Sequence, residues 1–270
     1  MVSTLALVTL LSLAPGQSDQ LQLTNAHATY GVMGPPRPNN QVLPGEVFWV
    51  TYDIENLAVD AGGEVRYSMG MELFNSKGKR EYGKDPQELK AYNFLGGTTL
   101  PAFANTQVGT ETPPGEYTLK VTVIDLGVKP NKTATLERKF EVLPKKFGIV
   151  NLHLTYDGDG RFPAPGTGVA GQTFFINFWT TGFERDKTKK QPDIVAELRI
   201  LDDKDKPTLA KPLIGTLGNE EVPAKAQQVF MQYTLPLNRT GKFSVQLKVT
   251  DQVSKKTTEL SFPITVLDSK

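Results

Sequence analysis

Hydrophobic and polar side chains alternate with a period of two through both halves of the chain. In residues 116–123 the side chains of Tyr117, Leu119, Val121 and Val123 fall on one face, with threonine and lysine on the other. Residues 242–249 repeat this alternation. Such a pattern is typical of antiparallel strands with one face in the core and one in water.

Similar alternation predicts most of the remaining strands. They are expected near residues 22–30, 46–54, 65–74 and 133–142 in the first half, and near 149–156, 172–180, 193–201 and 257–267 in the second. Less regular segments add strands around 89–95, 103–110 and 226–235. No stretch has helical periodicity, and turns rich in Gly, Pro and Asn separate the strands. Six to eight short strands per half predict an all-β fold of two-sheet sandwiches.

The two halves are copies of each other. The sequence NAHATY at residues 25–30 returns as NLHLTY at residues 151–156, a shift of 126 residues. The same shift relates Gly45 to Gly171, Phe48 to Phe174 and Asp125 to Asp251. Around residues 71–77 and 198–204 the shift is one residue longer. The duplication predicts two domains, residues 21–144 and 145–270. Their short linker, residues 143–147 with Pro144, predicts a rod with restricted motion.

The sequence of residues 114–123, PGEYTLKVTV, and its copy TGKFSVQLKV resemble immunoglobulin-like or fibronectin type III-like modules of bacterial secreted proteins. The resemblance implies two tandem antiparallel β-sandwiches. It also implies that Tyr117 makes a tyrosine corner, whereas Phe243 has no hydroxyl to do so. Two features depart from a true immunoglobulin domain. There is no cysteine pair, and both tryptophans lie on the second predicted strand rather than the third.

Composition narrows the classes of partner. The 270 residues carry 30 basic and 29 acidic side chains, and no basic cluster favours binding to nucleic acid. The absence of cysteine excludes thiol catalysis, thiolate metal sites and a lipid-modified cysteine. Nothing in the sequence indicates a cofactor.

The apolar residues 2–14 resemble the core of a secretory signal, although no Lys or Arg precedes them. A buried first strand is the alternative. We expect residues 1–20 to be a signal peptide and the mature protein to be secreted to the bacterial periplasm or beyond the cell. No later apolar segment has the length of a transmembrane helix, so none is expected after signal removal.

No catalytic residues are predicted. The two histidines, His27 and His153, occupy equivalent outward positions on the first strand of each half, where they are not expected to meet. Without cysteine or a suitably placed histidine, nucleophilic catalysis lacks a base. A pair of carboxylates across a cleft remains the open catalytic alternative.

No metal ligands are predicted either, although two acidic loops leave calcium as an alternative. In the loop at residues 157–160, Arg161 stands where an EF-hand requires a further oxygen ligand. The loop at residues 202–205 corresponds to a polar hairpin at residues 75–79. Ordinary turn chemistry explains both loops.

Three aromatic side chains are the candidate binding residues. If Phe48 and Tyr52 point into the core, alternation turns Trp49 outward, and the same argument turns Phe175 and Trp179 outward. Large aromatic rings on a nominally wet face are typical of partner-binding or sugar-stacking surfaces. The alternative is that these rings do not form a binding surface. A neighbouring loop or the other domain would then cover them, or the inward and outward faces of the strand would be interchanged.

These observations predict a secreted, non-enzymatic protein of two immunoglobulin-like domains that functions in binding, adhesion or surface assembly. Its partner would be an unidentified protein or polysaccharide. The alternative is a carbohydrate-binding or carbohydrate-active protein that uses the exposed aromatic face. A structural spacer is the third possibility.

Overall fold

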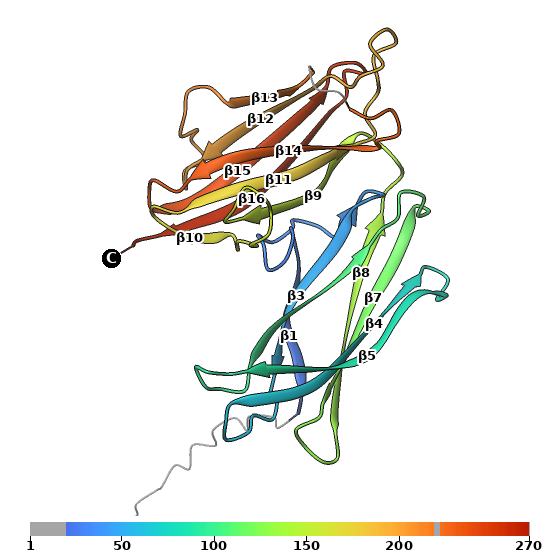
Figure 1. The fold of residues 1–270 in the computed structure, drawn as a ribbon, viewed down its shortest axis with the longest axis vertical. Coiled ribbons are helices and arrows are strands. Elements are labelled where there is room, and N and C mark those ends of the chain that lie inside the picture. Colours follow the sequence, from blue (N-terminus) through green and yellow to red (C-terminus); the bar gives the residue numbers. More distant parts are fainter. Residues whose placement is uncertain (1–19, 219–221, 270) are drawn as a thin grey trace, which may run out of the picture.

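The computed structural model describes residues 20–218 and 222–269, and all regular structure in them is β (Figure 1). The strands of the first sandwich are β1 (Gln22–Thr29), β2 (Gln41–Val42), β3 (Val47–Glu55), β4 (Glu64–Asn75), β5 (Arg80–Tyr92), β6 (Leu100–Gln107), β7 (Gly115–Asp125) and β8 (Lys132–Val142). The strands of the second sandwich are β9 (Gly148–Thr155), β10 (Thr167–Val169), β11 (Thr173–Thr181), β12 (Ile194–Leu201), β13 (Leu213–Leu217), β14 (Gln228–Pro236), β15 (Gly241–Asp251) and β16 (Thr257–Leu267).

Both sandwiches have the same topology. A three-stranded sheet, β1-β3-β6 or β9-β11-β14, faces a five-stranded sheet, β2-β8-β7-β4-β5 or β10-β16-β15-β12-β13. All pairings are antiparallel except those of the two short strands β2 and β10. The predicted all-β fold of two immunoglobulin-like sandwiches is therefore confirmed.

Alternation identified the buried faces correctly. Phe48, Val50 and Tyr52 on β3 are buried, as are Phe174 and Phe178 on β11. The alternation of hydrophobic and polar side chains predicted only the end of β5. This edge strand has solvent-exposed side chains on both faces over nearly its whole length, so it lacks the alternating pattern. The short strands β2, β10 and β13 were also missed.

The repeated NxHxTY motif encodes a β-bulge at the same place in both sandwiches. Asn25 and Asn151 have left-handed backbone angles, with φ of 52° and 53°. Asparagine tolerates this conformation better than most residues. Two residues later, Nδ1 of His27 lies 2.7 Å from the carbonyl oxygen of Asn25, and Nδ1 of His153 lies 2.9 Å from that of Asn151. A carbonyl only accepts, so each Nδ1 donates, and the two histidines are part of the bulge.

The predicted tyrosine corner is present in the first sandwich. The hydroxyl of Tyr117 donates to the carbonyl oxygen of Pro113 at 3.1 Å. In the second sandwich Phe243 takes the place of Tyr117, and Arg239 takes the place of Pro113. The guanidinium carbon of Arg239 lies 4.9 Å from the centre of the Phe243 ring, so a cation–π contact replaces the hydrogen bond.

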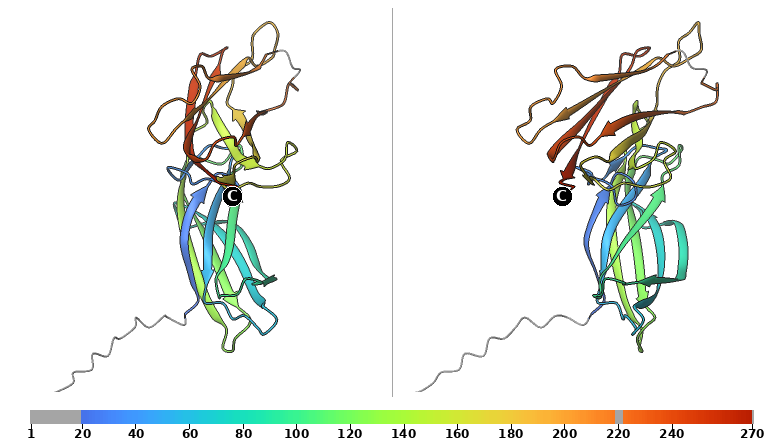
Figure 2. Two further views of the ribbon diagram at one scale, coloured as in Figure 1. Left: turned by 90° about the vertical axis from the view of Figure 1, so that its left-hand side faces the viewer. Right: turned by 60° about the vertical axis from the view of Figure 1, so that its left-hand side comes forward.

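The sandwiches lie one above the other along the long axis of the molecule, but their strands run in different directions (Figures 1 and 2). The elongated arrangement agrees with the expected rod, although the change in strand direction was not predicted. The boundary between residues 144 and 145, as a limit between folding units, stays a prediction. The proposed signal peptide lies outside the described residues apart from Gln20. The described part of the chain has no helix able to cross a membrane.

We expect Tyr117→Phe to lower the free energy of unfolding of the first sandwich by about 1 kcal/mol, since one net hydrogen bond is lost. Denaturant unfolding of the full chain measures the change. Tyr82→Phe is the matched control, because Tyr82 is exposed and its hydroxyl makes no hydrogen bond among the described residues. Equal stabilities of the two variants would contradict a role for the corner.

Candidate functional site

The loop between β1 and β2, residues 30–40, reaches across to the second sandwich. Tyr30 at its start is buried, and it belongs to the core cluster of the second sandwich rather than the first. Its ring centre lies 6.2 Å from that of Phe262 on β16. The next residue, Gly31, has a φ of 80°, and a Cβ there would come within 2.5 Å of the Cβ of His153. This contact surface between the two sandwiches is called the junction below.

A buried ion pair holds this loop. Nη1 of Arg37 lies 2.6 Å from Oε1 of Glu46, and both side chains are almost completely buried. Nη2 of Arg37 donates to the carbonyl oxygen of Gln41 at 2.6 Å, and the guanidinium lies over the Tyr30 ring. Oε2 of Glu46 accepts from the backbone N–H of Leu43. Burial raises the pKa of Glu46, and the charge of Arg37 opposes that rise.

The second sandwich keeps the loop but not the ion pair. Ala164 donates its backbone N–H to Leu154 as Arg37 does to Ala28, so alanine occupies the arginine position. Gln172 occupies the glutamate position and accepts from the backbone N–H of Val169 at 2.8 Å. The sandwich therefore forms without the charges. In the first sandwich they stabilise the loop that carries Tyr30 into the junction.

Asn151 clamps the two sandwiches together. Its Nδ2 donates to the carbonyl oxygen of Gly45 at 3.1 Å, and its Oδ1 accepts from the backbone N–H of Val47 at 2.8 Å. Nε2 of Gln228 on β14 donates to the same Gly45 carbonyl at 3.1 Å. The equivalent Asn25 donates instead to Asp53 within the first sandwich. The same bulge residue thus has an internal role in one copy and joins the sandwiches in the other.

Gly45 has to be glycine at this point. Its φ is 92°, and a Cβ would lie 2.4 Å from Nε2 of Gln228. The duplicated Gly171 has a similar φ of 95°, but a Cβ there would have open space around it. The close approach at Gly45 is therefore specific to the junction.

The outward aromatic residues form two pairs. Trp49 on β3 packs against Phe103 on β6, with ring centres 5.7 Å apart. Trp179 on β11 lies between Phe230 on β14, at 4.8 Å, and His153 on β9, at 5.7 Å. Both tryptophans are half-buried, whereas Phe103 and Phe230 are 40% and 46% exposed. The two pairs lie on the outer faces of the two three-stranded sheets.

Both aromatic pairs adjoin the junction. Trp49 lies two residues after Val47 on the same face of β3, and Val47 is held by the Asn151 clamp. His153, which stacks on Trp179, lies two residues after Asn151 on the same face of β9. The fixed junction therefore also fixes how the aromatic pairs are presented.

Phe175 is not part of either pair. It is half-buried, and its ring faces Gly158 in the loop after β9, where a Cβ would lie 3.5 Å from the ring. The outward side chain between Phe175 and Trp179 is Asn177, which is buried and donates to Thr155 at 2.8 Å. Of the three predicted candidates, the structure places Trp49 and Trp179 beside the junction and Phe175 under a loop.

Sequence reasoning missed Phe103, Phe230 and the second role of His153. The two phenylalanines lie in segments where strands were predicted, so a search for outward aromatics in those strands could have found them. His27 is exposed on β1 and has no aromatic partner among the described residues. The histidines therefore share a backbone role but have different surroundings.

The two acidic loops are occupied by internal contacts. Oδ1 of Asp157 accepts from the backbone N–H of Phe162 at 2.8 Å, and Arg161 pairs with Asp157 and Asp159. The backbone N–H groups of Lys206 and Lys204 donate to Oδ1 of Asp202 and hold its pKa below the usual range. Within residues 20–218 and 222–269, no three His, Asp or Glu side chains are grouped as a metal site.

No protein family model matches the chain, and no curated protein matches it. Similar solved structures include red sea bream transglutaminase, with a TM-score of 0.27 and 11% identity over 93% of this chain and 32% of that chain. The C-terminal domain of the Streptococcus agalactiae AgI/II polypeptide BspA has a TM-score of 0.29 and 9% identity, covering 91% and 99%. Pseudomonas fluorescens alkylpurine DNA glycosylase AlkC has a TM-score of 0.28 and 16% identity, covering 48% and 32%.

The matched part is about a third of the transglutaminase and of the glycosylase. At TM-scores this low, none of these structures informs the function of the chain. The site is therefore interpreted from its own geometry.

We expect Arg37→Ala to lower the free energy of unfolding by about 3–5 kcal/mol near neutral pH, because it leaves the Glu46 carboxylate buried without its partner. The double variant Arg37→Ala/Glu46→Gln reproduces the pair found in the second sandwich and should recover most of the loss. Denaturant unfolding of the full chain measures both. A double variant that is no more stable than Arg37→Ala would contradict the energetic coupling between Arg37 and Glu46.

The loss in free energy of unfolding caused by Arg37→Ala should also become smaller as the pH falls toward about 4, the ordinary range of a glutamate carboxyl. Burial raises the pKa of Glu46, so in the variant the carboxyl takes up a proton in the folded state before it does so in the unfolded state. Protonation removes the buried charge and stabilises the folded state relative to neutral pH. A deficit that stays constant or grows on acidification would contradict this reasoning.

We expect Asn151→Ala to weaken the junction by about 2 kcal/mol, since two net hydrogen bonds are lost. Hydrogen exchange at the backbone N–H of Val47 should become faster, because its acceptor is removed. Asn25→Ala is the matched control: it removes the equivalent bulge asparagine with the same backbone strain but leaves the junction intact. Equal exchange rates at Val47 in the two variants would show that the clamp does not hold the sandwiches.

Proposed function

We propose that the protein is a secreted, non-enzymatic binding protein whose two sandwiches act as one rigid body. It presents Trp49 with Phe103, and Trp179 with Phe230, to the surface of another protein or a polysaccharide. The observation that carries this proposal is the position of both aromatic pairs beside the Asn151 clamp.

Physical chemistry supports an aromatic surface on a rigid frame. Burying apolar area contributes roughly 25 cal/mol per Å², and aromatic rings supply much area with few rotatable bonds. A partner that contacts both sandwiches loses affinity if it must first order them relative to each other. The clamp removes that cost before the partner arrives.

The non-enzymatic part of the proposal rests on the surroundings of the histidines. Nδ1 of His27 and of His153 each donates to the carbonyl oxygen of the bulge. His153 is further confined by the ring of Trp179 and by Gly31. Neither histidine has a hydrogen bond to a serine or threonine hydroxyl among the described residues. A surface role for the site is therefore the simpler explanation.

A polysaccharide partner is the second candidate, and the side chains around Trp179 favour it. Asn177 and Gln232 form a hydrogen-bonded amide pair on the same outer face, with Nε2 of Gln232 donating to Oδ1 of Asn177 at 2.7 Å. Carbohydrate sites commonly combine an aromatic platform with amide groups. The N–H groups of both amides are used within the protein, by Thr155, Phe175 and Gly158 and by the bond between the two amides themselves. Sugar rings would therefore stack on the tryptophan and donate hydrogen bonds to Oε1 of Gln232.

We expect Trp49→Ala and Trp179→Ala each to weaken partner binding at least ten-fold, because each removes the largest ring of its pair. The labelled mature chain is tested on a glycan array and on the surface proteins of the source cells. Tyr92→Ala is the matched control, since Tyr92 is an exposed aromatic residue on the other sheet of the first sandwich.

A signal on glycans selects the polysaccharide candidate, and a signal on surface proteins selects the protein candidate. Binding that survives both tryptophan substitutions, or that is lost in Tyr92→Ala, would contradict the proposed surface. Hydrolytic turnover that depends on a particular pair of carboxylates would overturn the non-enzymatic assignment.

A further inference from the structure

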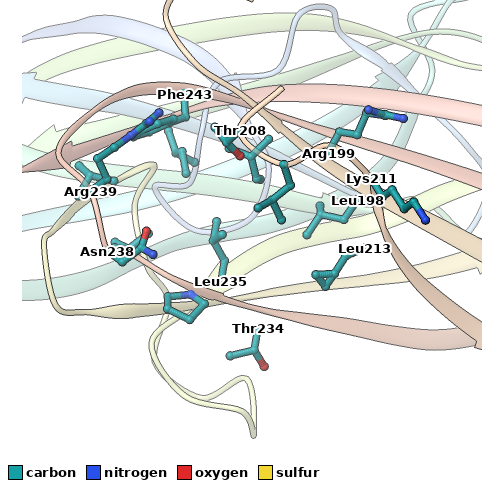
Figure 3. Close-up of a pocket in the computed structure, with 16 residues that line it drawn as sticks. Leu198, Arg199, Thr208, Lys211, Leu213, Thr234, Leu235, Asn238, Arg239 and Phe243 are labelled. Carbon is teal, nitrogen blue, oxygen red and sulfur yellow. The ribbon is translucent and has the colours of Figure 1, made fainter. Parts of the chain in front are cut away.

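The second sandwich contains a pocket of about 530 Å³ at the end of the sandwich remote from the linker (Figure 3). Its position follows from β11, which pairs with Gly148 beside the linker at one end and with Pro236 beside the pocket at the other. Its apolar lining includes Leu198, Leu213, Leu235, Leu237, Ile264 and Val266. All but Leu213 and Leu235 are buried, so the pocket reaches the space between the two sheets.

Three aromatic rings pack together at the corresponding place in the first sandwich. Phe140 stacks on Phe48, with ring centres 4.4 Å apart, and on Tyr117 at 5.8 Å. In the second sandwich Ile264 pairs with Phe243 in the register in which Phe140 pairs with Tyr117. The smaller Ile264 leaves open part of the space that a phenylalanine occupies in the other copy. The pocket is therefore a departure from the duplicated scaffold rather than a requirement of it.

Two cations, Lys211 and Arg239, flank the apolar lining. Figure 3 shows Lys211 on one side of the pocket and Arg239 beside Phe243 on the other. Arg199 also borders the pocket, but it alternates with the buried Leu198 and lines an outer-face hollow with Glu197 and Glu259. Neither Lys211 nor Arg239 has an ion pair among the described residues. Asp202 is close enough for its charge to interact with Arg239, but its Oδ1 is already bonded to two backbone N–H groups. The rim therefore has positive charge that the chain itself leaves largely uncompensated.

We propose that this pocket binds one medium-chain fatty acid, with the hydrocarbon chain between the sheets and the carboxylate at the cationic rim. Burial of the hydrocarbon chain favours binding, and the volume lies within the range of roughly 300–1,000 Å³ typical of small-molecule sites. Charge complementarity selects the anion over a neutral chain of the same length. A polysaccharide has no group to fill the apolar lining.

The test titrates dodecanoate into the full mature chain, with dodecanol as the neutral probe, and follows binding by calorimetry and native mass spectrometry. We expect one dodecanoate per chain and at least ten-fold weaker binding of dodecanol. Ile264→Phe, which introduces the residue of the first sandwich, should abolish binding. Lys211→Glu should weaken dodecanoate at least ten-fold, whereas Lys187→Glu at the other end of the sandwich should leave it unchanged.

The proposal is overturned if dodecanoate does not saturate at one per chain, or if a folded Ile264→Phe binds it as the unmodified chain does. Should Ile264→Phe fail to fold, the exposed Lys211 decides the matter. Equal affinities of Lys211→Glu and Lys187→Glu would then reject the pocket. Binding of dodecanol as tight as that of dodecanoate would reject the role of the cations. These outcomes are independent of the aromatic surface proposed above.

Discussion

The side chain of Asn151 links the backbone of one sandwich to the other, and the arrangement of both surfaces depends on this link. Its amide donates to Gly45 and accepts from Val47, so two groups at the start of β3 are fixed by one side chain. The five-residue linker restricts the relative motion of the sandwiches but does not by itself select one orientation. Gln228 and the Tyr30 loop add contacts around this point, and the aromatic pairs lie next to it.

The duplication explains why such a link could arise without a change of fold. Asn25 and Asn151 make the same left-handed bulge, but only Asn151 has backbone of the other sandwich within reach. The cores show a similar divergence, since Ile264 stands where the first copy has Phe140. The shared features maintain the sandwich. The features proposed to bind partners lie where the copies differ.

Alternation along the chain was enough to predict the sandwiches and to turn Trp49 outward, because a strand with one wet face has a period of two. It could not predict β5, whose side chains are exposed on both faces. Nor could it predict the clamp, because the partners of Asn151 are backbone groups that no residue type reveals. The pocket depends on the size of Ile264 relative to a residue in the other copy, which becomes meaningful only once strand register is known.

The most direct test measures distances between the two sandwiches in solution. The chain has no cysteine, so Glu137→Cys on β8 and Gln246→Cys on β15 give two unique, exposed sites for spin labels. Pulsed electron spin resonance then reports the distribution of distances between them. A clamped junction predicts one narrow distribution. A broad or multiple distribution in the doubly labelled chain would contradict the claim that the sandwiches form one rigid body.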